Sequence, residues 1–221
     1  MKYPNAYKGV KTLVKAMALN IAASVLFLLS ALLFVAAGIN LSEEQIDLNA
    51  LNTTVIIGIA LATLGALIIS LVSFILQIIG LKRGMKDEPL FKTALVYVFV
   101  GLASTFASSL MTGMVNSQLT DSFKILSEVS TLLISLYIIF ALRSLAQKLG
   151  NSKIDFKGKA LIWVLISVFL MTIVSRIIGI SSSELSSVLS ALAAVFDLIG
   201  YCLFLIYLIQ SKKMLAESSG G

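Results

Sequence analysis

Asp197 lies near the middle of a long apolar stretch, residues 183–209. A helix of this length rises far enough, at about 1.5 Å per residue, to cross a hydrocarbon core of about 30 Å. An acid at that depth costs on the order of a few kcal/mol when it is ionised in lipid. Asp197 is therefore expected to be protonated, hydrogen-bonded or in contact with a wet cavity, and the chemistry open to it is proton exchange or ligand binding.

The helical face that contains Asp197 is small and polar. Helix spacing places six residues on it: Ser190, Ala193, Ala194, Gly200, Tyr201 and Phe204. Small residues let helices approach closely in membranes, so Asp197 is expected to point into the protein. Two interpretations stay open. Either Asp197 belongs to a functional site, or it is a neutral acid that hydrogen-bonds a hydroxyl across a helix interface.

Glu128 and Arg176 form a second polar set. By rise per residue, each lies roughly 7 Å from the outer end of its own apolar stretch. Equal depth favours an ion pair. Candidates to add hydrogen bonds to it are Asn116, Thr112 and Tyr137, although Tyr137 is about two turns deeper. The pair is interpreted in two ways: as part of an outward-facing pocket, or as a structural pair in which Arg176 extends to the headgroups, the interpretation that we favour.

If the pocket forms, it is expected to bind a small polar or zwitterionic ligand, with Asp197 at its floor. The candidate ligand-binding residues are Asp197, Arg176, Glu128, Asn116 and Tyr201.

Residues for enzyme chemistry are missing from the sequence. The chain has no histidine, which removes the commonest general base and the commonest metal ligand. It has no G-x-S-x-G motif and no phosphate-binding loop, and Asp197 has no second buried aspartate for an intramembrane protease. The single cysteine, Cys202, has no partner for a disulfide. We therefore expect a non-enzymatic protein with no catalytic residue, metal or cofactor.

Composition places the chain in the membrane class. Hydrophobic residues make up 58%, charged residues 13%, and the mean hydropathy is +1.01, whereas a soluble domain has about 25% charged residues. The sequence predicts an all-α, polytopic membrane helical bundle in one transmembrane domain, 1–217, with a flexible tail at 218–221. Six transmembrane helices are expected at approximately 16–39, 55–81, 90–115, 123–146, 160–180 and 185–209.

Basic residues alternate with the predicted spans. All but Lys124 and Arg176 of the 17 lysines and arginines fall on the side that holds both termini. The positive-inside rule then predicts that both termini are cytoplasmic in a multi-pass protein of the cell membrane, most simply a bacterial cytoplasmic membrane. The basic residues on this side account for the net charge of +6. They are expected to set the orientation and to contact anionic lipid of the bilayer, so the charge does not indicate nucleic-acid binding.

Repeated patterns suggest three hairpins. A short aromatic-lysine pair enters each odd-numbered span, as in Phe91-Lys92 and Phe156-Lys157. Two spans also carry small residues at four-residue spacing, which lets helix backbones meet. These ridges are expected in the middle of the bundle, or at the face of a homodimer or membrane protein partner. Their residues are Gly58/Ala62/Ala66/Ser70 and Gly101/Thr105/Ser109/Gly113.

Two resemblances concern the first span. The pattern Tyr3-Pro4-Asn5, then Lys8-Gly9-Val10-Lys11 before a long Ala/Leu run, resembles small uncharacterised six-helix bacterial membrane proteins, which implies the layout but no activity. In length, helix number and basicity the chain is also similar to the substrate-binding subunits of energy-coupling-factor vitamin transporters. In that family an Ala-x-x-x-Ala pair packs on the coupling subunit, and Ala18 and Ala22 match it.

Two classes of function remain. The first is a non-catalytic accessory or structural protein that binds partners through helix–helix contacts, which the short loops favour slightly. The second is a small-solute binding or transport protein with a polar site in the outer half of the bundle. Carriers that work by alternating access often break their helices at Pro or Gly. This chain has only two prolines, which argues against an autonomous carrier of that kind.

Overall fold

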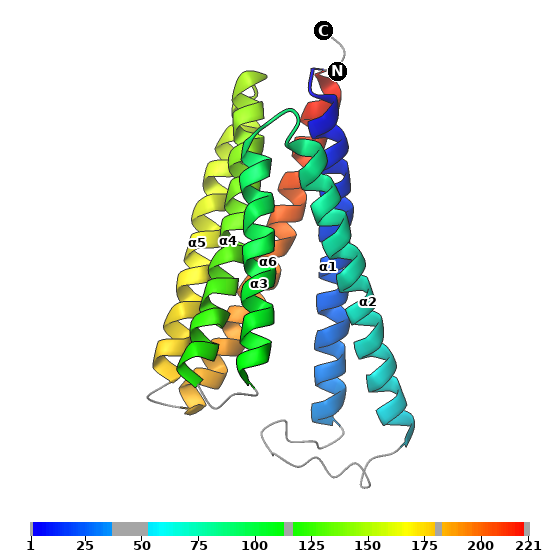
Figure 1. Ribbon diagram of the computed structural model, residues 1–221, viewed down its shortest axis with the longest axis vertical. Helices are drawn as coiled ribbons and strands as arrows, with labels where there is room; N and C mark the ends of the chain where they lie inside the picture. The colour runs from blue at the N-terminus through cyan, green and yellow to red at the C-terminus, as the bar shows by residue number, and fades with distance from the viewer. Residues whose placement is uncertain (1, 37–52, 113–116, 180–182, 219–221) are drawn as a thin grey trace. The chain divides into compact units, whose positions relative to one another are not determined.

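The computed structural model describes residues 2–36, 53–112, 117–179 and 183–218, and every regular element within them is an α-helix. Six helices follow one another along the chain (Figure 1): α1 (Pro4–Ala36), α2 (Thr53–Gly84), α3 (Leu90–Thr112), α4 (Ser117–Lys148), α5 (Ser152–Gly179) and α6 (Ser183–Glu217). Each contains a segment long and apolar enough to cross a membrane. The predicted all-α membrane bundle is confirmed.

The helices at the two ends of the chain run further than their predicted spans. Helix α1 begins at Pro4 rather than at residue 16, and α6 continues to Glu217 rather than to 209. Proline suits the first position of a helix because its missing N–H would have no partner there. Polar residues continue a helix beyond the apolar core because its backbone hydrogen bonds lie within the helix. The predicted span limits at 39, 115 and 180 lie outside the described residues.

Close packing divides the chain into two units. The larger unit consists of Met1–Val14 and Ile78–Gly221, and the hairpin unit of Lys15–Gln77. The single transmembrane domain over 1–217 stays a prediction. Of the predicted tail at 218–221, the structure describes Ser218, whose hydroxyl donates a hydrogen bond to the Leu215 carbonyl at 2.8 Å.

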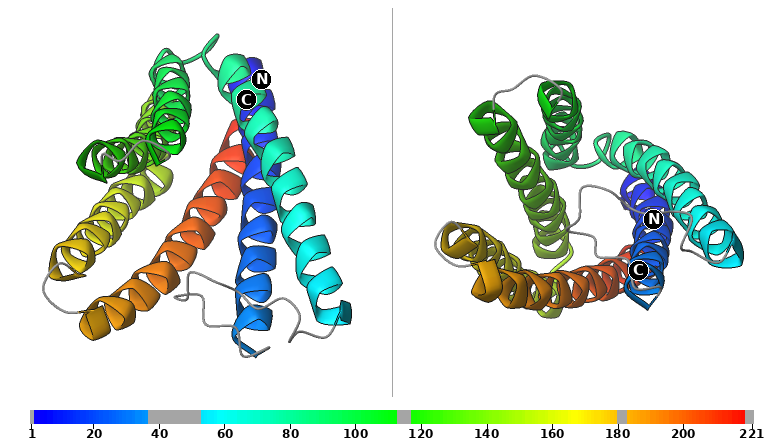
Figure 2. Two further views of the ribbon diagram at one scale, coloured as in Figure 1. Left: turned by 60° about the horizontal axis from the view of Figure 1, so that its bottom comes forward. Right: turned by 90° about the horizontal axis from the view of Figure 1, so that it is seen from below.

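In the larger unit, α4 packs against α3, α5 and α6, and α5 also packs against α6 (Figures 1 and 2). Its largest fully buried side chains lie near the ends of α2, α4 and α6 and the start of α3: Leu81, Phe91, Ile138, Ile139, Leu142, Leu145, Leu208 and Leu215. These are the helix ends that the positive-inside rule predicts to be cytoplasmic. The core of this unit is therefore densest at its predicted cytoplasmic end.

The α4–α5 connection is a short turn in which the end of α4 and the start of α5 are both capped. Gly150 has a φ of +68°, which glycine adopts without steric cost, and Asn151 N donates to the Ala146 carbonyl at 2.8 Å. Asn151 Oδ1 then accepts a hydrogen bond from Ile154 N at 3.1 Å, which caps the start of α5. This turn holds α4 and α5 side by side.

The α2–α3 connection reaches back to the start of α1. Asp87 accepts hydrogen bonds from Asn5 Nδ2 at 2.9 Å and from Ala6 N at 2.7 Å. The first turn of a helix has N–H groups without a partner in the helix, and it carries a partial positive charge. An acid at this point accepts hydrogen bonds from those N–H groups and is attracted by that charge. Asp87 therefore fixes the start of α1 to the turn between α2 and α3.

Gly158 marks a close approach of three helices. A Cβ atom at Gly158 of α5 would lie 2.5 Å from Arg143 Cγ of α4 and 2.7 Å from the Tyr207 hydroxyl of α6. A side chain at this position would force Arg143 or Tyr207 to shift. The three helices are therefore tightly packed near their predicted cytoplasmic end.

In the hairpin unit, α1 and α2 present buried residues at seven-residue intervals. These are Ala16, Ala23 and Ser30 on α1, and Ile59, Ala66 and Ser73 on α2. Ser73 Oγ donates to the Ala16 carbonyl at 2.7 Å. A seven-residue repeat is typical of helices that cross at about +20° with a left-handed twist. Small residues on this repeat let the two backbones approach.

The predicted ridge on α2 turns out not to share one environment. Gly58 is exposed, Ala62 and Ser70 are half-buried, and Ala66 is buried. Four residues advance a helix by one turn plus about 40°, so a four-residue ridge winds around the axis. A seven-residue repeat drifts less. Burial on α2 therefore follows the seven-residue spacing.

The ridge on α3 contacts α4 within the larger unit. A Cβ at Gly101 would lie 3.2 Å from Ser130 Cβ, and the hydroxyls of Thr105 and Ser127 are 2.8 Å apart. Ser109 is exposed, and Gly113 lies outside the described residues. Thus Gly101 and Thr105 serve a contact inside the chain.

Candidate functional site

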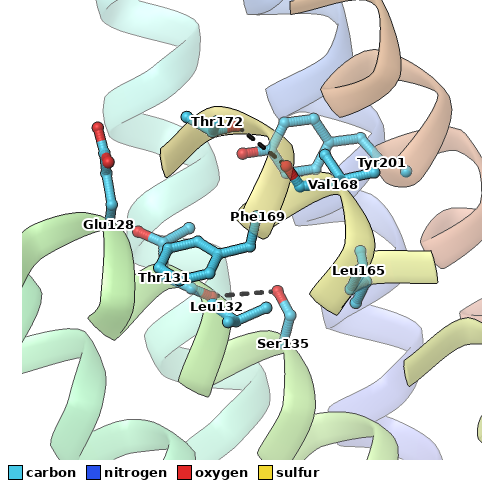
Figure 3. A pocket seen from close by; sticks show the side chains of 10 residues that line it. Glu128, Thr131, Leu132, Ser135, Leu165, Val168, Phe169, Thr172 and Tyr201 are labelled. Carbon is cyan, nitrogen blue, oxygen red and sulfur yellow. Dashed lines mark hydrogen bonds between the residues drawn. The ribbon is translucent and has the colours of Figure 1, made fainter. Parts of the chain in front are cut away.

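A pocket of about 240 Å³ lies between α4, α5 and α6 in the larger unit (Figure 3). Its lining includes Glu128, Thr131, Leu132 and Ser135 from α4, Leu165, Val168, Phe169 and Thr172 from α5, and Gly200 and Tyr201 from α6. Leu165 is seven residues, about two turns, beyond the close approach at Gly158. The same three helices are thus in tight contact at one level and enclose a pocket further along.

Helix α4 provides a polar face to the pocket. Its lining residues recur every three or four positions, which places them along one side of the helix. Thr131 Oγ1 donates to the Ser127 carbonyl at 3.0 Å, and Ser135 Oγ donates to the Thr131 carbonyl at 3.2 Å. A hydroxyl has one hydrogen and two acceptor lone pairs. Each of these hydroxyls therefore uses its donor within the helix and keeps acceptor capacity.

Helix α5 combines apolar residues with one hydroxyl. Thr172 Oγ1 donates to the Val168 carbonyl at 3.1 Å, the same four-residue pattern as on α4. In Figure 3 the Phe169 ring lies across the middle of the pocket, near Thr131 and Leu132. This face of α5 therefore contributes an aromatic ring and a further back-bonded hydroxyl.

Helix α6 approaches α5 through Gly200. The glycine is buried, and a Cβ there would lie 3.5 Å from Leu165 Cδ2, an ordinary van der Waals contact. Tyr201 follows and adds a second aromatic ring that is half-buried. At the other side Thr131 is exposed, so the pocket extends from the surface of the unit inward to Gly200.

Glu128 provides the acidic group of the pocket. It is half-buried, and its Oε2 atom is shielded from solvent. Among the described lining residues it is the one acidic side chain.

The structure brings two of the five predicted site residues together. Glu128 of α4 and Tyr201 of α6 both line the pocket. Arg176 follows Thr172 by one turn of α5, and Asp197 precedes Tyr201 by one turn of α6, but both side chains lie outside what the structure describes. Asn116 also lies outside the described residues. The Glu128–Arg176 ion pair and Asp197 as the floor of the pocket therefore stay predictions.

Tyr137, expected about two turns deeper than Glu128, does not reach the pocket. It is not among the residues that line the pocket, and its ring stacks on Tyr97 of α3 at 5.4 Å between centroids. Four further residues of the lining were not predicted from the sequence: Thr131, Ser135, Phe169 and Thr172. The signal for the first two was present, because Thr131 and Ser135 follow Glu128 at helix spacing.

A second group of charges lies around the α4–α5 turn. Asp155 Oδ1 accepts hydrogen bonds from Arg143 Nε at 2.8 Å and Gln147 Nε2 at 3.1 Å, and Lys159 Nζ lies 3.6 Å from its Oδ2. This cluster is a set of contacts between helix ends. Within the described residues, no group of three or more His, Cys, Asp or Glu side chains is placed to hold a metal ion.

Comparison of the chain with protein-family models, with curated proteins and with solved structures finds no match. The two resemblances given above therefore stay predictions.

Proposed function

We propose that this integral membrane protein binds a small polar solute in the pocket between α4, α5 and α6. The observation that carries the proposal is the lining, in which one carboxylate and four hydroxyl-bearing side chains converge from three helices. Polar side chains within a membrane bundle are costly unless they pair with one another, with water or with a ligand. A solute bound among these side chains would add hydrogen bonds to those that they already make.

The size of the pocket restricts the solute. Its volume of about 240 Å³ is below the 300–1,000 Å³ of typical pockets for drug-sized ligands. A water molecule takes about 30 Å³ of the liquid, so the pocket corresponds to roughly eight waters. The solute is therefore about the size of an amino acid or a small amine.

Binding is better supported than autonomous transport. Helices α4, α5 and α6 each run without a break through the described residues that line the pocket. Carriers that work alone often hold their substrate at broken helices. We therefore propose a binding protein, which would need a partner if the solute is to cross the membrane.

Thermal unfolding of the detergent-solubilised chain tests the proposal. Amino acids, amines, sugars and nucleosides would be screened one by one. A ligand that binds only the folded protein stabilises it by about 2.7 kcal/mol at 100 times its dissociation constant. We expect at least one solute to raise the melting temperature, and Ser135→Ala to reduce that shift.

Ser109→Ala is the matched control. Ser109 Oγ donates to the Thr105 carbonyl at 3.0 Å, as Ser135 does to Thr131, but Ser109 is exposed on α3 and does not line the pocket. The Ser109 variant should keep the full ligand-induced shift. If no solute shifts the melting temperature of the folded chain, the binding proposal fails.

An accessory role is the second candidate, and it rests on exposed small residues of the hairpin unit. Ala18, Ala22 and Gly58 are exposed, and a Cβ at Gly58 or Gly65 would meet no atom within 4 Å. Small residues let another transmembrane helix approach closely. If this surface forms a homodimer, Gly58→Leu should convert the purified dimer to a monomer, as light scattering after gel filtration would show.

A further inference from the structure

We propose that the start of α1 and the end of α2 form a binding site for the phosphate group of an anionic phospholipid. Three exposed basic residues make up the site, Lys8, Arg83 and Lys86, and Arg83 is its central group. The site lies within the larger unit and shares no residue with the pocket, so it is independent of the proposed solute binding.

A buried hydroxyl holds Arg83 where the two helices meet. Arg83 Nη1 of α2 donates a hydrogen bond to Thr12 Oγ1 of α1 at 3.3 Å, and Thr12 is 8% exposed. The Thr12 hydroxyl donates its own hydrogen to the Lys8 carbonyl at 2.9 Å, so it meets Arg83 with a lone pair. A guanidinium has five N–H donors. The contact with Thr12 therefore orients the group and leaves other donors for an anion.

Arg83 has no acidic partner among the described residues, since no acid there lies within ion-pairing distance of its guanidinium. Two acids follow Arg83 in the α2–α3 turn, but both contact other helices. Asp87 accepts hydrogen bonds from the first turn of α1, and Glu88 accepts them from α4. The charge of Arg83 is thus paired with no described carboxylate, which favours an anionic partner.

Two lysines lie on the same side as Arg83. Lys8 precedes Thr12 by one turn of α1 and shares its helical face. Lys86 follows Arg83 by about one turn, and its N–H donates to the Arg83 carbonyl at 3.4 Å. The backbones of α1 and α2 are in close contact at Gly9, next to Lys8. Basic groups from both helices are therefore close enough to surround one phosphate.

The level of the site favours a lipid over a soluble anion. Arg83 lies two residues beyond Leu81, where the apolar stretch of α2 ends, and headgroups lie at the ends of such stretches. Ile79, one turn before Arg83, is half-buried and gives apolar surface for an acyl chain. Basic sites between transmembrane helices on the cytoplasmic side bind anionic headgroups, and these helix ends are predicted to be cytoplasmic. The planar guanidinium also matches two phosphate oxygens at once.

Titration of the full detergent-solubilised chain tests the inference. The probes are phosphatidylglycerol and phosphatidylcholine with the same acyl chains, which differ in net charge, and inorganic phosphate. Native mass spectrometry measures the fraction of the chain that carries each probe and so gives an apparent dissociation constant. Because each basic residue contributes to the binding of an anionic headgroup, we expect phosphatidylglycerol to bind at least about fivefold more tightly than phosphatidylcholine.

Two variants and one control locate the effect. Arg83→Ala should weaken phosphatidylglycerol binding at least about fivefold and leave phosphatidylcholine unchanged. Thr12→Val keeps the charge of Arg83 but removes the hydroxyl that orients it, so it should weaken phosphatidylglycerol by a smaller factor. It carries the test if Arg83→Ala does not fold. Lys153→Ala is the matched control, because it also removes one exposed positive charge from the predicted cytoplasmic side, but at the start of α5. It should bind phosphatidylglycerol as the native chain does.

Three results would overturn the inference. The first is equal affinity for the two lipids. The second is an equal loss in Arg83→Ala and Lys153→Ala, because the preference would then come from net charge rather than from a site. The third is inorganic phosphate that binds as tightly as phosphatidylglycerol and depends on Arg83, which would make the ligand a soluble phosphate. The solute pocket is lined by α4, α5 and α6, so its own test is unaffected by each of these results.

Discussion

Glu88 shows how single residues fix the ends of the helices. This acid of the α2–α3 turn is 4% exposed, and its Oε2 accepts hydrogen bonds from Ser144 Oγ at 2.9 Å and Lys148 Nζ at 2.6 Å. Removing it leaves both α4 groups without their acceptor. Solvent replaces part of the lysine contact, because the Lys148 side chain is 47% exposed. We expect Glu88→Ala to lower the free energy of unfolding by about 1–3 kcal/mol.

Glu88→Gln should be milder than Glu88→Ala, because its amide oxygen still accepts from Ser144 while the attraction to Lys148 is lost. Thermal unfolding in detergent measures both. Glu217→Ala is the control, since Glu217 is an exposed acid at the end of α6. Equal melting temperatures for Glu88→Ala and Glu217→Ala would contradict a structural role for Glu88.

At the residue scale the sequence predicted Glu128 and Tyr201 as site residues but not most of the neutral residues that line the pocket. Glu128 was a candidate because an acid within an apolar stretch is unusual. Phe169 was not, because it is one of 12 phenylalanines and most apolar residues of such a chain face lipid. Whether a phenylalanine faces lipid or a pocket depends on how its helix is rotated. That rotation is set by packing, for which a uniformly apolar helix gives little periodic signal.

At the scale of elements, the packing of α1 on α2 depends on a backbone contact at Gly9. A Cβ at Gly9 would lie 2.6 Å from the Gly80 carbonyl oxygen and 2.8 Å from Gly84 N. Both are backbone atoms, so a side-chain rotation cannot relieve the clash. Gly9→Ala is therefore expected to lower the free energy of unfolding by about 1–3 kcal/mol, the usual cost of overpacking.

Gly65→Ala is the matched control on α2. A Cβ there meets no atom within 4 Å, and alanine favours a helix over glycine by up to about 1 kcal/mol. This variant should be as stable as the native chain or slightly more stable, by thermal unfolding in detergent. A Gly9→Ala variant as stable as Gly65→Ala would disprove the close contact between α1 and α2.

Hydropathy predicted which stretches are helices, because a chain in lipid must satisfy its backbone hydrogen bonds within each segment. It did not predict where α1 and α6 end, since residues beyond the hydrocarbon can be polar and still helical. It also did not predict which small residues are buried. Ala66 belongs both to the four-residue ridge and to the seven-residue repeat, whereas Gly58 belongs to the ridge and is exposed. Which of the two patterns is buried depends on the angle at which α1 and α2 cross, and the sequence of α2 alone does not give that angle.

At the scale of the whole molecule, the distribution of charge sets the orientation in the membrane. Basic residues gather at the start of α1, at the α2–α3 and α4–α5 turns, and at the end of α6. Loops rich in lysine and arginine remain in the cytoplasm during insertion. We therefore predict that the α4–α5 turn is inside and the start of α4 outside. The pocket, which lies nearer the start of α4 than its end, would then be in the outer half and accessible to an external solute.

Cysteine labelling tests this orientation with little disturbance, because Cys202 is the one cysteine of the chain and Cys202→Ala gives an unlabelled background. Asp121→Cys lies near the start of α4 and Lys153→Cys near the start of α5, and both native residues are exposed. In intact cells a membrane-impermeant maleimide should label Asp121→Cys alone. Lys153→Cys should react only after permeabilisation. The opposite pattern would place the pocket on the cytoplasmic side and would require that its solute be an intracellular one.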